Sequence, residues 1–183
     1  MKLKPVLSRR ALLRHSVRAA ALAAGAGLIV PARAAGVRSL ALVHTHTGEH
    51  IDLVYASEAA YDRAALAALN HFLRDHYSGD VGTIDPALFD QLHRVQRALG
   101  AARPFEVISG YRCPATNERL RTSRGGGVAR HSLHVEGRAI DVRIQNASLT
   151  ELRDAALALR AGGVGFYPRE RFVHLDTGRV RAW

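Results

Sequence analysis

The chain has 183 residues, of which 26 are Lys or Arg and 16 are Asp or Glu. Residues 1–34 hold seven of the basic residues and none of the acidic ones. The rest therefore has 19 basic and 16 acidic residues, a net charge of +3. A domain with this charge and scattered arginines gives no case for nucleic-acid binding. The single cysteine, Cys113, excludes an intramolecular disulfide, and no nearby base marks it as a nucleophile.

The first 34 residues have the features of an export signal. Ser8-Arg9-Arg10-Ala11-Leu12-Leu13 is close to a twin-arginine motif, an apolar run follows, and Ala32-Arg33-Ala34 offers a small-x-small cleavage site. The uncharged apolar run, residues 19–30, is shorter than the roughly 20 residues that span a bilayer. We expect cleavage after Ala34, no stable membrane anchor afterwards, and a periplasmic location reached by the twin-arginine route.

Residues 35–183 are predicted to form a single α+β domain, a small antiparallel sheet packed with helices. Hydrophobic periodicity and capping residues predict helices over residues 61–77, 86–99, 115–120 and 148–161. Alternating apolar patterns predict strands over residues 40–43, 51–55, 103–108, 139–144, 164–167 and 172–175. A flexible loop is expected at residues 125–127.

Three histidines, His44, His46 and His50, lie in the first predicted hairpin. His44 and His46 share one face of their strand, which is an arrangement that can hold a metal. We interpret these histidines as the polar face of an edge hairpin and not as a second metal site.

The stretch HSLHVEGRAIDVRI, residues 131–144, carries the clearest chemical signal. His134 and Asp141 flank a turn at Gly137, and strand alternation puts Asp141 on the face opposite its apolar neighbours. Imidazole nitrogen and carboxylate oxygen are both normal zinc donors. A third ligand, His174, is expected from the last predicted strand. Two histidines and one carboxylate leave a fourth position open for water, as in catalytic zinc sites, where the metal also polarises a carbonyl oxygen.

Three segments in order carry a family resemblance: SGYR at residues 109–112, SxHxxGxAxD at residues 132–141, and FVHLDTG at residues 172–178. Together they resemble the zinc D-Ala-D-Ala metallopeptidase family (LAS-type), which also includes lysostaphin-type and hedgehog-type domains, and within it the murein endopeptidase K branch. The similarity covers most of the chain after residue 38. It implies a hedgehog-like fold with zinc in a cleft on the sheet, and a zinc metallopeptidase that cuts cross-links or stem peptides of peptidoglycan.

The resemblance also implies a substrate-binding and catalytic role for Arg112. A planar guanidinium can hold a carboxylate through two parallel hydrogen bonds, and peptidoglycan stem peptides carry free carboxylates. Ser132 is expected either to bind substrate or to orient the loop that carries His134.

The general base is not settled by the sequence. Many relatives have an acidic residue three positions before the last zinc histidine, or a second histidine two before it, but here these positions hold Arg171 and Phe172. Asp176 shares a strand face with His174, and is either the base or, as we favour, a carboxylate that fixes the tautomer of His174. The remaining candidates are Glu170, Glu136 and His131.

Two other functions stay open. The same site could serve a D,D- or L,D-carboxypeptidase, because the openness of the cleft decides between internal and terminal cleavage. The missing acidic residue before His174 leaves room for a zinc-containing cell-wall binding module without turnover.

The export motif makes a testable prediction. Replacing Arg9 and Arg10 together by lysine should leave the precursor in the cytoplasm, because the twin-arginine pair is the recognised feature. Cell fractionation and immunoblotting measure this. An unchanged periplasmic yield would show that another route is used.

Overall fold

Eight strands form one sheet in the computed structural model, which describes residues 36–100, 103–123, 128–145 and 147–183. The predicted signal segment, its cleavage site and the predicted loop at residues 125–127 lie outside the described residues. The strands are β1 (Val37–His44), β2 (His50–Ser57), β3 (Ala60–Tyr61), β4 (Phe105–Ser109), β5 (Ala139–Ile144), β6 (Gly163–Tyr167), β7 (Phe172–Asp176) and β8 (Arg181–Ala182). Their order across the sheet is β3-β2-β1-β4-β5-β7-β6-β8.

The α+β class is confirmed, but the sheet is larger than predicted, and it is mostly and not entirely antiparallel. The sheet has eight strands, and β1 pairs with β4, and β6 with β8, in parallel. The chain leaves β2, passes through two helices and returns as β4 beside β1, and such a long crossover permits parallel pairing. Strands β3 and β8 have two residues each, too few to show an alternating pattern.

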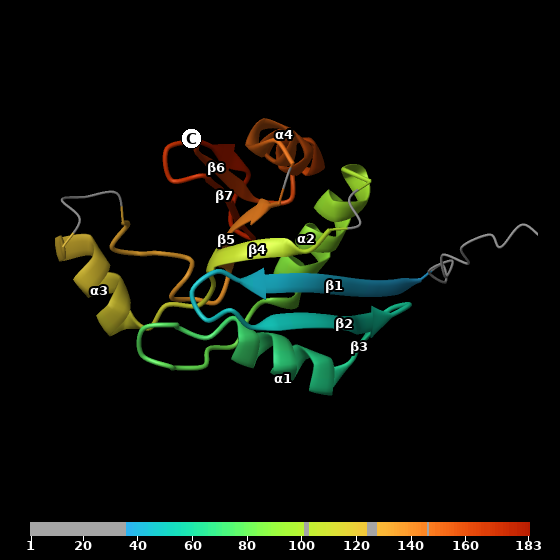
Figure 1. Cartoon of the computed structure of the whole chain (residues 1–183), viewed down its shortest axis with the longest axis horizontal. Coiled ribbons are helices and arrows are strands. Elements are labelled where there is room, and N and C mark those ends of the chain that lie inside the picture. The colour runs from blue at the N-terminus through green and yellow to red at the C-terminus, as the bar shows by residue number, and fades with distance from the viewer. Residues whose placement is uncertain (1–35, 101–102, 124–127, 146) are drawn as a thin grey trace, which may run out of the picture. The chain divides into compact units, whose positions relative to one another are not determined.

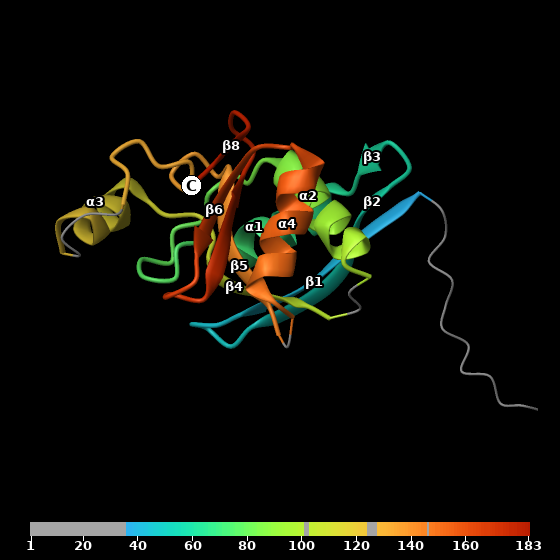
Figure 2. The ribbon, with the colours of Figure 1, turned by 90° about the horizontal axis from the view of Figure 1, so that it is seen from above.

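Three helices cover one face of the sheet: α1 (Arg63–Phe72), α2 (Pro86–Ala98) and α4 (Leu149–Leu159). Their apolar side chains, such as Leu69, Leu92 and Leu152, share a core with Val107 and Val142 of the sheet. Figures 1 and 2 show α3 (Pro114–Ser123) apart from the other helices. Among the described residues, no helix has both the length and the apolar character needed to cross a membrane.

Helix α1 ends earlier than predicted. It stops at Phe72, and residues 73–77, which the periodicity assigned to the helix, form a turn. The buried carboxylate of Asp75 accepts hydrogen bonds from the backbone N–H of Tyr77 at 2.9 Å and of Cys113 at 2.9 Å. Because Asp75 satisfies backbone donors in a non-helical conformation, the local turn wins over helix propagation.

Alternation along two central strands separates the core from the opposite face of the sheet. In β5, Ile140 and Val142 belong to the hydrophobic core, and Asp141 between them points to the other face. In β7, Val173 and Leu175 belong to the core, with His174 between them. The predicted separation of ligands from core residues is therefore confirmed.

The turn that leads into β5 requires glycine at position 137, which is Gly137. Its φ is +67°, and a Cβ atom there would lie 2.0 Å from the carbonyl oxygen of Thr83. The backbone N–H of Asp85 donates to the carbonyl of Gly137 at 2.9 Å, which joins this turn to the start of α2. Only glycine fits, because both the dihedral angle and the space exclude a side chain.

Replacing Gly137 by alanine should destabilise the fold more than the same change at Gly79. Gly79 has a φ of +82° but open space around its Cβ position. We expect Gly79→Ala to cost about 1–2 kcal/mol of unfolding free energy from the left-handed backbone. Gly137→Ala should cost about 1–3 kcal/mol more because of the added overlap. Urea denaturation measures both, and equal losses would contradict this account.

Candidate metal centre and cleft

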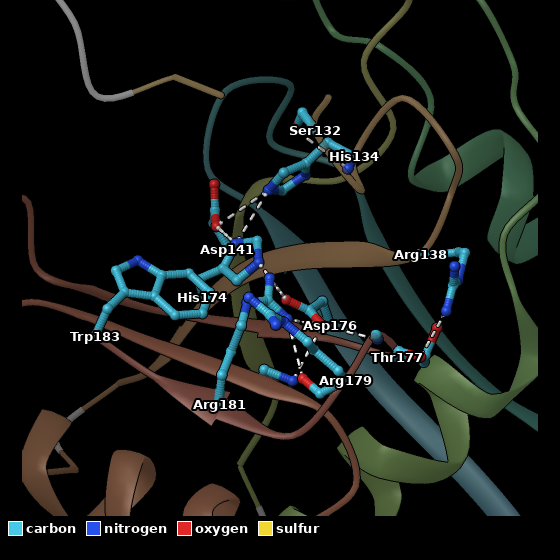
Figure 3. A network of polar contacts seen from close by, with 12 residues as sticks. Ser132, His134, Arg138, Asp141, His174, Asp176, Thr177, Arg179, Arg181 and Trp183 are labelled. Carbon is cyan, nitrogen blue, oxygen red and sulfur yellow. Dashed lines mark hydrogen bonds and ion pairs between the residues drawn. The ribbon is translucent and has the colours of Figure 1, made fainter. Parts of the chain in front are cut away.

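The sheet brings the predicted ligands together through strand pairing. Asp141 of β5 lies opposite His174 of β7, and Ser109 of β4 lies opposite Asp141 on the other side. Directly opposite residues on antiparallel strands have side chains on the same face. His134 comes from the turn that precedes β5 and completes the group (Figure 3).

Three donor atoms converge at this group. His134 Nε2 lies 3.3 Å from Asp141 Oδ1, and His174 Nδ1 lies 2.8 Å from the same oxygen. The two imidazole nitrogens are 3.3 Å apart. Within the described residues, this is the only group of three or more His, Cys, Asp or Glu side chains that could hold a metal ion.

The outer nitrogen of each histidine is held by an acceptor. His134 Nδ1 lies 2.7 Å from the carbonyl oxygen of Gly110, and His174 Nε2 lies 3.2 Å from the carboxylate of Asp176. A carbonyl oxygen only accepts hydrogen bonds, so Nδ1 of His134 carries the proton and Nε2 offers a lone pair to the group. Outer-shell acceptors of this kind orient histidine ligands in metal sites. The residues therefore fit a metal ion.

The electrostatics of the group favour an ionised carboxylate. Burial on its own would raise the pKa of Asp141, but the nearby His134 and His174 outweigh burial and hold the pKa well below its usual range. Burial lowers the pKa of His134. The group thus presents an anionic oxygen and a neutral imidazole to a cation.

Arg112 lies beside His134, Asp141 and His174, the three candidate metal ligands, which we call the metal group. Its Nη2 donates to Asp141 Oδ2 at 2.8 Å, and its Nε donates to the hydroxyl of Ser109 at 2.9 Å. Its Nη1 makes no hydrogen bond with any residue that the structure describes, and Arg112 lines the cleft. The contact with Asp141 was not foreseen from the sequence.

Asp176 is completely buried, and its contacts occupy both oxygens. Oδ1 accepts from the backbone N–H of Gly163 at 3.0 Å and of Gly178 at 2.8 Å, and Oδ2 accepts from Arg181 at 2.7 Å. Oδ2 also contacts His174. These are the contacts of a carboxylate that orients His174, and Asp176 does not line the cleft. Its role as general base stays a prediction without a supporting contact.

The other predicted site residues differ in whether they line the cleft. The Ser132 hydroxyl accepts from the backbone N–H of His134 at 3.4 Å, and Ser132 also lines the cleft. His131 and Glu170 line the cleft too, whereas Glu136 pairs with Arg138 at 3.3 Å and does not.

The metal group opens into a cleft of about 630 Å³. Several ring side chains that the sequence analysis did not assign to the site line it: His46, His76, Tyr77, Tyr167, Phe172 and Trp183. Only His46 was singled out, as part of an edge hairpin with a polar face. The edge-hairpin part of that interpretation is wrong, because β1 is an internal strand, His44 is 1% exposed, and His46 faces the cleft. No local signal reveals this, since it depends on the long-range pairing of β1 with β4.

Comparisons with known proteins agree with the resemblance drawn from the motifs. A family model described as peptidoglycan L,D-endopeptidase MepK matches residues 32–183. The peptidoglycan L,D-endopeptidase MepK of Escherichia coli (strain K12) is 49% identical over 146 residues, 80% of each chain. The probable peptidoglycan L,D-endopeptidase MepK of Haemophilus influenzae is 38% identical over 147 residues, 80% of this chain and 78% of the relative. No solved structure matches. The chain belongs to the MepK family of peptidoglycan endopeptidases.

Removing any one of the three donors should remove the metal. We expect His134→Ala, Asp141→Ala and His174→Ala each to lose affinity by more than the roughly 10–100-fold typical of outer-shell changes. His131→Ala, a cleft histidine outside the group, is the matched control and should keep its metal. Elemental analysis after dialysis measures the metal content of each variant. A full complement of metal in His174→Ala would refute the assignment of His174 as a ligand.

Proposed function

We propose that this protein is a zinc-dependent peptidoglycan hydrolase that cleaves L,D peptide bonds within cross-links. The observation that carries the proposal is the convergence of His134, Asp141 and His174 on the floor of a cleft. Membership of the family supports the bond type, because both relatives are named L,D-endopeptidases. We further propose that it acts in the periplasm after export, the compartment that the sequence of residues 1–34 indicates.

The zinc ion would be held by His134 Nε2, Asp141 Oδ1 and His174 Nδ1, the atoms that face one another. When bound, zinc supplies a Lewis acid suited to amide hydrolysis. The choice of zinc rests on the donor set, since two imidazole nitrogens and one carboxylate oxygen are the ligands of several catalytic zinc sites.

Arg112 would act on both the protein and the substrate. Its Nη2 holds Asp141 in place, and its Nη1, which has no hydrogen-bond partner among the described residues, is available for a carboxylate or carbonyl oxygen of the stem peptide. The guanidinium fork can make these two contacts at once, which a lysine could not do with the same geometry.

Asp176 would position His174 and take no proton from water. Its buried carboxylate holds the outer nitrogen of His174, and Arg181 with two backbone amides holds the carboxylate. Proton removal would then fall to a group that reaches the cleft. Of the candidates, Glu170 and His131 line it, while Glu136 and Asp176 do not.

Muropeptide analysis tests the proposed function. The purified zinc-loaded protein is incubated with two sets of cross-linked muropeptide dimers, one joined by an L,D bond and one by a D,D bond. We expect only the L,D-linked dimers to yield monomers in liquid chromatography and mass spectrometry. Loss of a single terminal residue from monomers would instead indicate a carboxypeptidase. Sedimentation with sacculi without any product would indicate a binding module.

Arg112→Ala should lower kcat/KM for the L,D-linked dimer by about ten- to a hundredfold. A hydrogen bond to a charged group is worth roughly 1.5–3 kcal/mol, and each 1.4 kcal/mol or so is a factor of ten. Arg112→Lys should recover only part of the loss, and Arg63→Ala, an exposed arginine outside the cleft, should change nothing. All assays use saturating zinc with metal content measured, and an unchanged kcat/KM in Arg112→Ala would contradict this role.

A further inference from the structure

Residues around the metal group form a row that runs across the strands. In this row, Ser109 pairs with Asp141, Asp141 with His174, and His174 with Gly165, while on β1 His44 pairs with Val107, two residues before Ser109. The metal ligands of β5 and β7 therefore lie inside the row, with β4 and β1 on one side and β6 and β8 on the other. Five steps between strands at about 4.8 Å each give a row roughly 24 Å long. An extended peptide advances about 3.3–3.6 Å per residue, so several residues fit on this line.

At the β8 end of the row, a fixed ring side chain stands beside the metal group. The indole N–H of Trp183 donates to the hydroxyl of Tyr167 at 2.7 Å. The Trp183 ring lies beside His174, with 5.3 Å between the two ring centres (Figure 3). The guanidinium of Arg181 lies 4.7 Å from the centre of the Trp183 ring. Backbone hydrogen bonds to Val164 and Phe166 hold Trp183 in place, yet 49% of it is exposed. We call Trp183 and Tyr167 the Trp183 wall.

Gly165 makes room for this wall. A Cβ atom at Gly165 would lie 2.7 Å from the ring of Trp183 and 2.8 Å from that of Tyr167. Any side chain at this position would push the two rings away from the sheet. The wall is thus built into the strand beneath it and is not a chance surface contact.

At the β1 end of the groove, two stacked rings and a third, tilted ring form a platform. His46 and His76 are parallel within 3°, with centres 4.2 Å apart, and Tyr77 lies 4.2 Å from His76. Arg119 of α3 lies 4.5 Å from the centre of the Tyr77 ring. The turn anchored by Asp75 positions this set, which we call the histidine platform, and all three of its rings line the cleft.

The histidine platform is suited to contact and not to metal binding. Stacked rings do not converge their nitrogens on one point, and the described residues contain no metal-binding trio here. Burial lowers the pKa of His76, which favours the neutral form of its ring. Neutral ring faces pack well against methylene groups and peptide planes.

We propose that the cleft is a two-sided groove, in which the histidine platform holds the stem peptide on one side of the scissile bond and the Trp183 wall holds the stem peptide on the other. This inference rests on the proposed function. It explains how an enzyme acting inside a cross-link engages both joined peptides: the cleft continues on either side of the metal group and has ring contacts at each end.

A crossed comparison of variants and substrates tests the groove. The substrates are an intact L,D-linked dimer and two shortened forms, each lacking the outer residues of the stem peptide on one side. The variants are His76→Ala and Trp183→Ala, with His50→Ala and Val180→Ala as exposed controls outside the cleft lining. We expect each test variant to lose about tenfold in kcat/KM on the intact dimer. For each variant, that loss should vanish with the substrate that lacks the residues contacted by the mutated side chain. The loss should persist with the substrate that is shortened on the opposite side of the scissile bond.

Several outcomes would overturn the groove. Equal losses on all three substrates would show a merely structural effect, as would loss of zinc from Trp183→Ala at saturating metal. Trp183→Phe and His76→Phe keep a ring and should recover most of the activity if ring contact is the cause. If the wild type cleaves no dimer, the proposed function fails separately. In that case, binding affinities for the same three molecules are measured by calorimetry to test the two-sided groove. We expect each variant to lose affinity only for molecules that keep the residues on its side, and absence of this pattern would refute the groove.

Discussion

A carboxylate that is only 4% exposed needs hydrogen-bond donors that replace its lost hydration, and for Asp141 these are Arg112 and His174. His134 and His174 approach one oxygen, and Arg112 donates to the other. Each of these three side chains is itself held: His134 by the carbonyl of Gly110, His174 by Asp176, and Arg112 by the hydroxyl of Ser109. The geometry of the cleft floor thus follows from how the fold compensates one buried charge. A cation at the group would take over part of that compensation.

The central strands place core residues on one face of the sheet and the candidate metal ligands on the other, because side chains alternate along a strand. Ile140 and Val142 pack in the core that α4 covers, which fixes the position of β5 and therefore of Asp141 between them. The same holds for His174 between Val173 and Leu175. The candidate ligand atoms are therefore fixed by residues of the core, which suits a site whose donors must stay within about 0.5 Å of their geometry.

Local patterns in the sequence were sufficient for the parts of the site that lie within single elements. Strand alternation placed Asp141 and His174 on the polar face, and the Ser148 cap marked the start of α4. The position of Arg112 near the ligands came from the family resemblance. Parallel pairing of β1 with β4 could not be predicted, because it depends on where the α1–α2 crossover returns.

The ring side chains around the cleft were missed for related reasons. Trp183 follows a strand of two residues, which shows no periodicity, and its place beside His174 depends on β8 pairing with β6. His76 and Tyr77 continue an apparent helical pattern, and only the hydrogen bonds of Asp75 end the helix before them. In each case a contact between distant segments outweighs the local preference.

Strand β8 links two properties of the cleft that would otherwise be independent. A parallel ladder of two residues at a sheet edge is the kind of segment that opens locally at small free-energy cost, well below global unfolding. When β8 opens, Arg181 leaves Asp176, and Trp183 leaves Tyr167 and His174 in the same event. The orientation of His174, a proposed metal ligand, and the shape of the cleft wall therefore share one opening equilibrium. A ligand that packs against Trp183 would favour the paired state of β8, and would thereby favour the observed orientation of His174 without contacting His174.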